Sequence, residues 1–373
     1  MRTRASLPRF TRMGARASKW LGLDVLDCAD LDPFSGRLPL ALPSLDIQGV
    51  ASFIRDAQAP IKIVVLAGSG ISTAAGIPDF RSPSAGLYAT LAARGFSHKP
   101  ETIFSRDVFD HNPQPLYDAL CAMWAEGDDS TGRTAFPTAT HHFLAMLDAR
   151  GMLSRIYTQN VDGLERRAGV RAERVVQVHG SMHEAYCDTS AGQVDVPIEE
   201  LRAALLKGEE GPGGWRALAQ KYGGFVRPAV CLFGEPLPAE FAQMAARDLT
   251  ECDLLIVMGT HLKVEPAASL VNSIRVDVPR LVINRTRLET RPSTAAVQQA
   301  ELMGACEAAL NSTLHFGESN HRNVEFLGDC DDGCRALARC LGPDWAKELA
   351  ERATDDSIMA AVPPSRTSLK ASL

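Results

Sequence analysis

The sequence predicts an α/β fold in which a parallel sheet is covered by helices on both faces. Short aliphatic runs alternate along the chain with amphipathic stretches of helical periodicity. Within each run, regular alternation of polar and apolar residues is weak, as in strands buried on both faces. A glycine-rich turn, residues 68–76, follows the first run directly. Ligands of such folds bind beyond the carboxyl ends of the strands, so we look for functional residues there.

The elements are expected in a regular order. The strands are predicted at Ile61–Ala67, Ser154–Thr158, Val175–Val178, Leu254–Met258 and Arg280–Asn284. The helices are predicted at Ile47–Asp56, Ala139–Ala149, Pro238–Asp248, Pro266–Ser273 and Cys334–Leu341. A glycine-rich segment at about 185–228, with one expected helix at Ile198–Leu206, interrupts the alternation. We interpret it as a small inserted module.

Composition and charge limit the classes of function. The 373 residues are 45% hydrophobic and 23% charged, which is typical of a globular chain with more than one folded unit. A net charge of −6 argues against nucleic-acid binding through bulk electrostatics. No apolar run reaches the roughly 18 residues that would cross a membrane. Nine cysteines without any C-x-x-C spacing suit a reducing compartment better than a disulfide scaffold.

Both ends of the chain are expected to lie outside the folded domain. The first 23 residues contain basic but no acidic side chains, which is typical of a mitochondrial transit peptide and equally of a disordered basic tail. We therefore expect a disordered N-terminal extension at 1–43 and a folded domain at 44–345. Residues 346–373 would form the end of a helix and a disordered tail.

The glycine-rich turn is a candidate phosphate site. It begins with Gly68-Ser69-Gly70-Ile71-Ser72-Thr73 and is expected to open a helix. Glycines allow close approach of the backbone to a pyrophosphate, and a helix N-terminus offers free N–H groups. The spacing differs from G-x-G-x-x-G, and no acidic residue follows about 20 positions later. A tight turn without a ligand is the alternative.

Polar side chains follow the next strand ends. Asp79, Phe80 and Arg81 combine an acid, an aromatic ring and a base in a loop where a plain connector needs none of them. The second strand ends in 158–162, Thr-Gln-Asn-Val-Asp, and the third in His179-Gly180. A histidine near its ordinary pKa can abstract a proton at neutral pH, although a lone histidine is more often structural.

These motifs, followed by Phe233-Gly234-Glu235, Gly259-Thr260 and Ile283-Asn284, resemble the sirtuin family over roughly residues 44–345. The run 327–334 resembles the class I branch, which includes cytoplasmic and nuclear protein deacetylases. The resemblance implies a Rossmann-like domain with a smaller module, and an NAD-dependent protein-lysine deacylase. Such an enzyme transfers the acyl group of acyl-lysine to ADP-ribose and releases nicotinamide.

The resemblance also implies partners and a location. The partners would be acyl-lysine-bearing proteins, with histones or tubulin as family analogies, and neither nucleic acid nor membrane is expected. The location would be the cytoplasm, the nucleus or both, with the mitochondrion as the alternative offered by the basic N-terminus.

By position, the resemblance assigns roles to residues. His179 would be the general base that acts on a ribose hydroxyl, and Asn160 would act beside it in the nicotinamide pocket. Residues expected to bind the cofactor are Gly68, Ser69, Gly70, Ile71, Ser72, Thr73, Ile77, Asp79, Phe80, Arg81, Gln159, Asn160, Val161, Asp162, Gly259, Thr260, His261, Asn284, Arg285, Thr286 and Cys330. The acyl-lysine channel would be formed by Cys231, Leu232, Phe233, Gly234 and Glu235.

Two of these cofactor residues carry a reservation. His261 stands where the family usually has serine, a departure that could alter a phosphate contact. For Cys330, which would adjoin adenine through its backbone, the alternative is that it merely shares a helical face with Cys334.

The family's structural zinc is not expected here. Most sirtuins hold zinc with two cysteine pairs in the small module, and only Cys187 remains in this chain. One thiolate cannot form a closed tetrahedral site. We expect the module to be held by packing that involves Tyr222, Trp215 and Leu218. A site that uses His183 and Cys187 with distant partners is the alternative.

Two further functions remain open. Transfer of ADP-ribose to a protein would use the same NAD site, although the apolar channel at 231–233 argues against it as the main activity. A non-catalytic NAD-binding sensor of the same fold is the other alternative.

Overall fold

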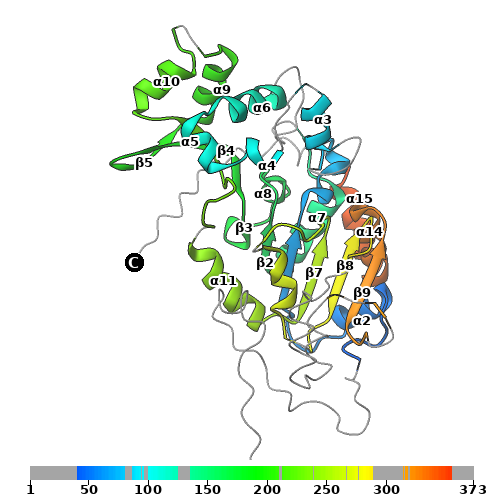
Figure 1. Cartoon of the computed structure of the whole chain (residues 1–373). Helices are drawn as coiled ribbons and strands as arrows, with labels where there is room; N and C mark the ends of the chain where they lie inside the picture. Colours follow the sequence, from blue (N-terminus) through cyan, green and yellow to red (C-terminus); the bar gives the residue numbers. More distant parts are fainter. Residues whose placement is uncertain are drawn as a thin grey trace, which may run out of the picture.

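The computed structural model describes the chain from residue 40 to residue 354 with internal gaps (Figure 1). The gaps are residues 80–85, 94, 96–99, 125–134, 210–211, 238, 266, 276, 289–313, 315 and 318–319. The basic segment 1–23 and the expected tail beyond residue 354 lie outside the described residues, as do Phe80 and Arg81.

The main sheet has six parallel strands in the order β3-β2-β1-β7-β8-β9. They are β1 (Ile63–Ala67), β2 (Leu153–Thr158), β3 (Val175–Gln177), β7 (Leu254–Met258), β8 (Arg280–Asn284) and β9 (Asn323–Leu327). The predicted α/β fold and its five expected strands are confirmed. The sixth strand, β9, was not predicted because Asn323 and Glu325 interrupt its apolar character. It lies at the edge of the sheet, where the buried Asn323 accepts a hydrogen bond from Arg280 of β8 at 2.7 Å.

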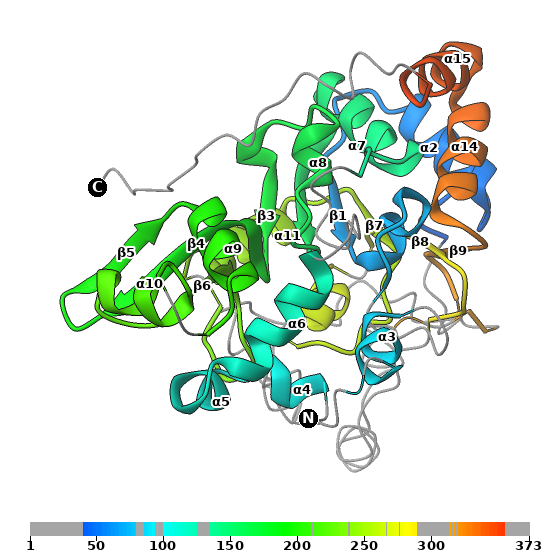
Figure 2. The same cartoon turned by 90° about the horizontal axis from the view of Figure 1, so that it is seen from above.

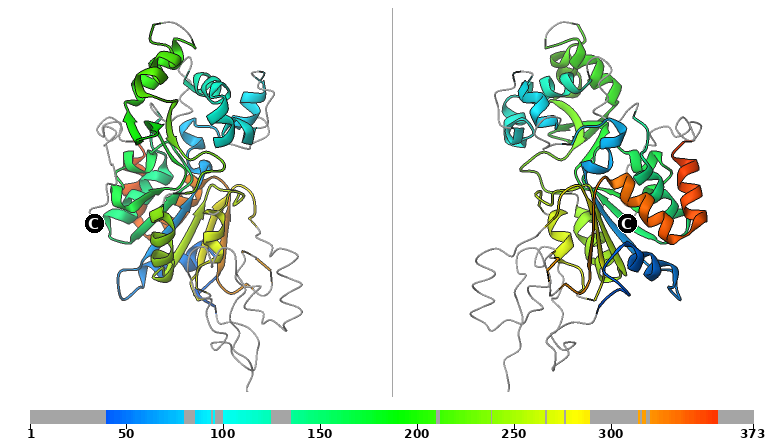
Figure 3. Two further views of the ribbon diagram at one scale, coloured as in Figure 1. Left: turned by 60° about the vertical axis from the view of Figure 1, so that its left-hand side comes forward. Right: turned by 90° about the vertical axis from the view of Figure 1, so that its right-hand side faces the viewer.

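Helices cover both faces of this sheet (Figure 3). On one face lie α2 (Ile47–Arg55), α7 (Ala139–Ala149), α14 (Cys330–Leu341) and α15 (Pro343–Arg352). On the other lie α11 (Ala239–Thr250) and the 3₁₀ helix η5 (Ala267–Asn272). In β1, Ile63 and Val65 face the first set of helices, whereas Val64 and Leu66 face the second. Burying each such side chain contributes about 1.5–3 kcal/mol.

A smaller antiparallel sheet lies beyond the carboxyl ends of the main strands (Figures 1 and 2). Its strands, in the order β5-β4-β6, are β4 (Gly180–Thr189), β5 (Gly192–Val196) and β6 (Val226–Val230). The predicted helix α9 (Ile198–Leu206) is confirmed, and a second helix, α10 (Trp215–Tyr222), was not predicted. The small sheet begins at Gly180 and ends at Val230, so it extends beyond both ends of the inserted module expected at about 185–228.

Four helices from an earlier part of the chain share a core with this small sheet. They are α3 (Leu87–Ala93), α4 (Pro100–Ile103), α5 (Arg106–His111) and α6 (Gln114–Trp124). Figure 2 shows α5 and α6 beside the sheet, on the side where α9 and α10 also lie. The smaller half of the molecule is therefore built from two separate segments, of which sequence analysis identified only the second.

The remaining elements are short connections. They are the 3₁₀ turns η2 (Ser69–Ile71), η3 (Thr73–Ala75) and η4 (Ala172–Arg174) and the one-turn helix α8 (Leu164–Arg167). The glycine-rich turn therefore leads into two 3₁₀ turns rather than into the expected helix. None of the described helices is long and apolar enough to cross a bilayer.

The last described helix, α15, extends the folded part beyond residue 345, where the domain was expected to end. Trp345 lies with its ring centroid 5.9 Å from that of Phe143 on α7. The guanidinium carbon of Arg150 stands 4.0 Å from the Trp345 ring centroid, within reach of a cation–π contact. Leu349 is buried in the core of the main sheet. The end of a helix expected after residue 345 therefore lies in α15 (Pro343–Arg352), which packs against the main core.

Candidate active site

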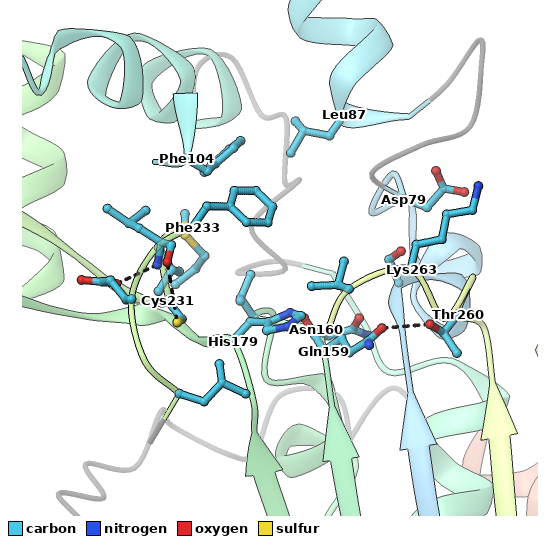
Figure 4. Close-up of a pocket in the computed structure, with 18 of the residues that line it drawn as sticks. Asp79, Leu87, Phe104, Gln159, Asn160, His179, Cys231, Phe233, Thr260 and Lys263 are labelled. Atoms are coloured by element: carbon cyan, nitrogen blue, oxygen red, sulfur yellow. Dashed lines mark hydrogen bonds between the residues drawn. The ribbon is translucent and has the colours of Figure 1, made fainter. Parts of the chain in front are cut away.

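A cavity of about 230 Å³ lies at the carboxyl edge of the main sheet, between that sheet and the smaller half (Figure 4). It adjoins the ends of β1 and β7, the neighbouring strands at which the strand order reverses, and such switch points are the usual ligand sites of α/β sheets. The sequence-predicted residues that line it are Ser69, Asp79, Gln159, Asn160, Val161, His179, Cys231, Leu232, Phe233, Gly234, Glu235, Gly259, Thr260 and His261.

The glycines at the switch point are required by the contact between two turns. A Cβ on Gly70 would lie 2.6 Å from the Cα of Gly259, and one on Gly68 would lie 2.7 Å from the Gly259 carbonyl oxygen. The Gly70 N–H donates to that same carbonyl at 2.8 Å. The turn after β1 therefore packs directly on the turn after β7. This contact explains the glycine spacing without a ligand, and phosphate binding by the turn stays a prediction.

The other predicted cofactor residues do not line the cavity. Those of the glycine-rich turn and its vicinity are Gly68, Gly70, Ile71, Ser72, Thr73, Ile77 and Asp162, and those near the end of β8 are Asn284, Arg285, Thr286 and Cys330. The Asn284 side-chain amide donates to the Thr286 carbonyl at 2.9 Å. Arg285 pairs with Asp329. The Cys330 side chain is buried in the core with Cys334, so the two share a helical face, and the expected contact of the Cys330 backbone with adenine stays a prediction.

His179 is held as a proton acceptor that faces the cavity. Its Nδ1 lies 3.1 Å from the Gln159 backbone carbonyl, which can only accept a hydrogen bond. Nδ1 therefore carries the ring proton, and Nε2 keeps its lone pair. Burial lowers the pKa of His179, so the neutral ring predominates at pH 7. Among the described residues, the buried Nε2 has no hydrogen-bond partner.

Two amide side chains beside His179 are also oriented by the protein. The Asn160 amide donates to Ser72 Oγ at 3.1 Å, and Ser72 Oγ donates to Asp162 Oδ2 at 2.7 Å. The Gln159 side-chain oxygen accepts from Thr260 Oγ1 at 2.9 Å (Figure 4). Asn160 Oδ1 and Gln159 Nε2 are buried and lack partners within the described chain.

Three unsatisfied polar atoms thus surround one cavity: His179 Nε2, Asn160 Oδ1 and Gln159 Nε2. A buried donor or acceptor without a partner costs about 1–3 kcal/mol, which a bound ligand can recover. Two acceptors and one donor match a carboxamide and sugar hydroxyls. The residues present therefore fit the nicotinamide ribose half of NAD.

The opposite side of the cavity is mainly apolar, and sequence analysis missed most of it. The missed apolar residues are Leu87, Phe104, Leu116, Leu120, Met182, Val230 and Leu237. Lys263, Val264 and Glu265, which follow His261 along the chain, were also missed, and Figure 4 shows Lys263 beside Asp79 and Thr260. Leu116 and Leu120 stand one turn apart on α6, which is the ordinary pattern of a core-facing helix. Nothing in that pattern distinguishes a residue that lines a cavity from one that fills a core.

Backbone hydrogen bonds and ion pairs hold the loop 231–235 in place. Phe233 forms an isolated bridge, since its N–H donates to the Phe104 carbonyl at 2.8 Å and its carbonyl accepts from Arg106 N–H at 3.0 Å. The Glu235 carboxylate accepts from Leu232 N–H at 2.7 Å and pairs with both Arg106 and the buried Arg227. These contacts hold the loop as one wall of the cavity.

The described part of the small module does not offer the donors of a zinc site. The Cys187 thiol is buried, and its sulfur lies 3.8 Å from the backbone oxygens of Asp188 and Tyr222. A Cβ on Gly224 would stand only 3.0 Å from that sulfur. Burial raises the pKa of Cys187, which favours the thiol over the metal-binding thiolate. The single cluster of metal-type side chains found among the described residues lies elsewhere, at His141, Asp162 and Glu165.

Aromatic rings occupy the centre of this module instead. The ring centroid of Trp215 lies 5.2 Å from that of Tyr117 and 6.0 Å from that of Phe225. Phe109 stands edge-on to both Tyr117 and Phe225, with centroids at 5.9 and 6.0 Å. The Tyr117 hydroxyl donates to the Val226 carbonyl at 2.8 Å. Helices α5 and α6 are thereby joined to α10 and β6.

Comparisons with known proteins agree with this architecture. A model of the Sir2 family matches residues 68–266. The chain is 36% identical to NAD-dependent protein deacetylase sirtuin-2 of Danio rerio, over 83% of this chain and 75% of that protein. It is 39% identical to NAD-dependent protein deacetylase sirtuin-3 of Mus musculus, over 86% of this chain and 87% of that protein. With NAD-dependent protein deacetylase hst2 of Schizosaccharomyces pombe it shares 32% identity, over 84% and 81% of the two chains. The chain belongs to the Sir2 family.

Proposed function

We propose that this protein is an NAD-dependent protein deacetylase. The observation that carries the proposal is the position of His179, whose unprotonated Nε2 faces the same cavity as the free Asn160 Oδ1. The relatives at 36% and 39% identity are named NAD-dependent protein deacetylases, which supports the same activity here.

The residues of the chain divide the chemistry between them. NAD, when bound, would supply the ribose carbon that nicotinamide leaves and the ribose hydroxyl that receives the acyl group. Asn160, fixed through Ser72, would present its Oδ1 to the carboxamide. His179 would accept the proton of that hydroxyl at Nε2, and the Gln159 carbonyl would stabilise the charged ring through Nδ1. The apolar wall of the cavity would limit the access of bulk water to this exchange, and one water molecule is consumed when lysine is released.

The substrates of the proposed reaction are proteins that carry acyl-lysine. The apolar lining from α6 and from loop 231–235 favours a neutral acyl group, since an unpaired carboxylate buried there would cost several kcal/mol. An extended peptide would add as a strand beside loop 231–235, mainly through its backbone. This mode of binding does not select between histones, tubulin or other proteins.

Release of nicotinamide tests the proposal. We expect release from NAD to depend on an acetyl-lysine peptide, with a succinyl-lysine peptide of the same sequence reacting far more slowly. The measurement is chromatography of nicotinamide together with mass spectrometry of the peptide. Release of nicotinamide with transfer of labelled ADP-ribose from NAD to a protein would instead identify an ADP-ribosyltransferase. Binding of NAD without release of nicotinamide would identify a sensor.

We further propose that the small module folds without zinc, because Cys187 is its only cysteine and its sulfur is packed against backbone. We expect elemental analysis of the purified chain to find far less than one zinc per molecule. Incubation with a chelator should leave the unfolding temperature unchanged. Stoichiometric zinc that survives dialysis would refute this proposal.

A further inference from the structure

A buried cluster of three titratable side chains lies behind Asn160. His141 comes from α7, Asp162 from the loop after β2 and Glu165 from α8, and their ligand-type atoms all lie within 4.8 Å of one another. The exposed fractions are 0% for His141, 4% for Asp162 and 0% for Glu165. None of the three lines the cavity. The chemistry proposed above uses neither His141 nor Glu165.

Hydrogen bonds connect this cluster to the cavity in one direction. Asp162 Oδ2 accepts from Ser72 Oγ at 2.7 Å, and Ser72 in turn accepts from the Asn160 amide at 3.1 Å. Asp162 Oδ1 accepts from Leu164 N–H at 3.0 Å. With both oxygens accepting, Asp162 serves as the carboxylate that orients Ser72 and, through it, Asn160.

His141 is neutral and fully buried beside the two carboxyl groups. Burial lowers the pKa of His141 to about 4, so the ring carries no charge at neutral pH. The backbone N–H of Thr138 donates to His141 Nδ1 at 3.1 Å, and the Thr138 hydroxyl oxygen lies 2.8 Å from the same nitrogen. His141 Nε2 has no hydrogen-bond partner among the described residues. His141 therefore adds no positive charge that would hold a second carboxyl group ionised.

Glu165 has no hydrogen bond that would stabilise a negative charge. Neither of its carboxyl oxygens has a partner of ordinary geometry among the described residues. A fully buried carboxyl group without such partners, close to a second carboxylate, loses its proton only at a raised pH. Because both oxygens of Asp162 accept hydrogen bonds, the proton of this pair belongs on Glu165.

We propose that Glu165 is a positioning residue of the nicotinamide pocket: in its protonated form it leaves Asp162 as the single charge of the cluster and so keeps the chain Asp162–Ser72–Asn160 in place. Burial, and then the charge of Asp162, raise the pKa of Glu165 to about 8. The groups that face the cluster are His141 from α7, the Thr158 hydroxyl from β2, and His183 from β4, whose Nε2 lies 2.7 Å from the Asp162 carbonyl. Asp331 of α14 acts on His141 from a greater distance.

The proposal makes the pocket sensitive to alkaline pH. As the pH rises through about 8, Glu165 loses its proton, and a second negative charge then repels Asp162. The orientation of Asn160 is weakened, and with it the binding of nicotinamide. The inference rests on the proposed function only for the identity of the ligand, nicotinamide. The ionisation of Glu165 does not depend on that function.

The first measurement follows nicotinamide binding in the full chain between pH 7 and 9.5, as the inhibition constant for peptide-dependent release. For the unchanged protein we expect the affinity to fall several-fold above pH 8. Glu165→Gln, whose amide has nearly the same shape and cannot ionise, should bind about equally well across this range. Glu165→Ala should bind more weakly at every pH. Identical pH profiles for the unchanged protein and Glu165→Gln would overturn the proposal.

The second measurement needs no catalysis and separates this inference from the proposed activity. The folded-state pKa of Glu165 is raised above its ordinary value, so its contribution to stability is complete below about pH 4.5 and is lost as the pH rises to about 8. The unfolding temperature of the unchanged protein should therefore fall relative to that of Glu165→Gln between pH 5 and 8, and no further above it. Glu351→Gln, an exposed change on α15, is the matched control and should show no such trend. A constant difference across this range would also overturn the proposal.

Discussion

Replacement of His179 by alanine should lower the rate of peptide deacetylation by about 10²–10⁴-fold, the usual contribution of a general base. The variant loses the only ring nitrogen in the described lining of the cavity that is held unprotonated by a backbone carbonyl. NAD should still bind, because the turns after β1 and β7 and the amides of Asn160 and Gln159 are unchanged. The measurements are the turnover of an acetyl-lysine peptide by mass spectrometry and NAD affinity by calorimetry.

The pH dependence of the unchanged enzyme should report the same group. Burial lowers the pKa of His179, so the base form persists to below pH 6.5 and the acid limb of the rate should lie below that pH. His111→Ala is a suitable control, since this histidine is exposed on α5 away from the cavity. Turnover retained in His179→Ala would remove this residue from the mechanism.

The second large effect is expected at Trp215. Its replacement by alanine should lower the free energy of unfolding by about 3–5 kcal/mol, the range for removal of a large buried ring. The ring is 4% exposed and packs between Tyr117 and Phe225, in a module whose described residues lack a set of zinc ligands. If the module folds without zinc, as proposed, few other contacts compensate for the loss of this packing. Denaturant unfolding of both proteins measures the difference.

The control for this experiment lies on the neighbouring helix. Leu206 at the end of α9 is 57% exposed, so Leu206→Ala should change stability by no more than about 0.5 kcal/mol. Unfolding should be repeated with a chelator and with added zinc. The loss of unfolding free energy caused by Trp215→Ala should be the same under the two conditions. A cost that disappears in the presence of zinc would show that metal, and not the aromatic cluster, holds the module.

The main sheet could be predicted from the sequence because its strands are buried on both faces. Such strands appear as uninterrupted aliphatic runs, and β1, β7 and β8 were predicted to within two residues. Strand β9 and the three strands of the small sheet do not have this pattern. In β4, polar and apolar residues alternate irregularly across a bulge between Ser181 and Ala185, and no period of two can be recognised.

Part of the site could be predicted from short sequence motifs, and the rest depends on contacts that form only in the folded chain. Asn160 and His179 stand next to strand ends in short motifs, so their place in a cavity could be predicted. The tautomer of His179 could not, because it depends on one backbone group, the Gln159 carbonyl. The apolar wall from α6 depends on a contact between distant segments of the chain.

The first rung of the small sheet joins the two sides of the reaction. Gly180 pairs with Val230, and the next N–H along, that of Cys231, donates to the His179 carbonyl at 2.8 Å. The proton acceptor and the wall that holds the substrate are therefore adjacent positions of one hydrogen-bonded ladder. Because His179 Nδ1 also meets the Gln159 carbonyl at the end of β2, the base is tied to both halves of the molecule. Its distance from the wall is therefore set by main-chain hydrogen bonds, so substitutions of side chains in the wall can change which acyl group fits without moving the base.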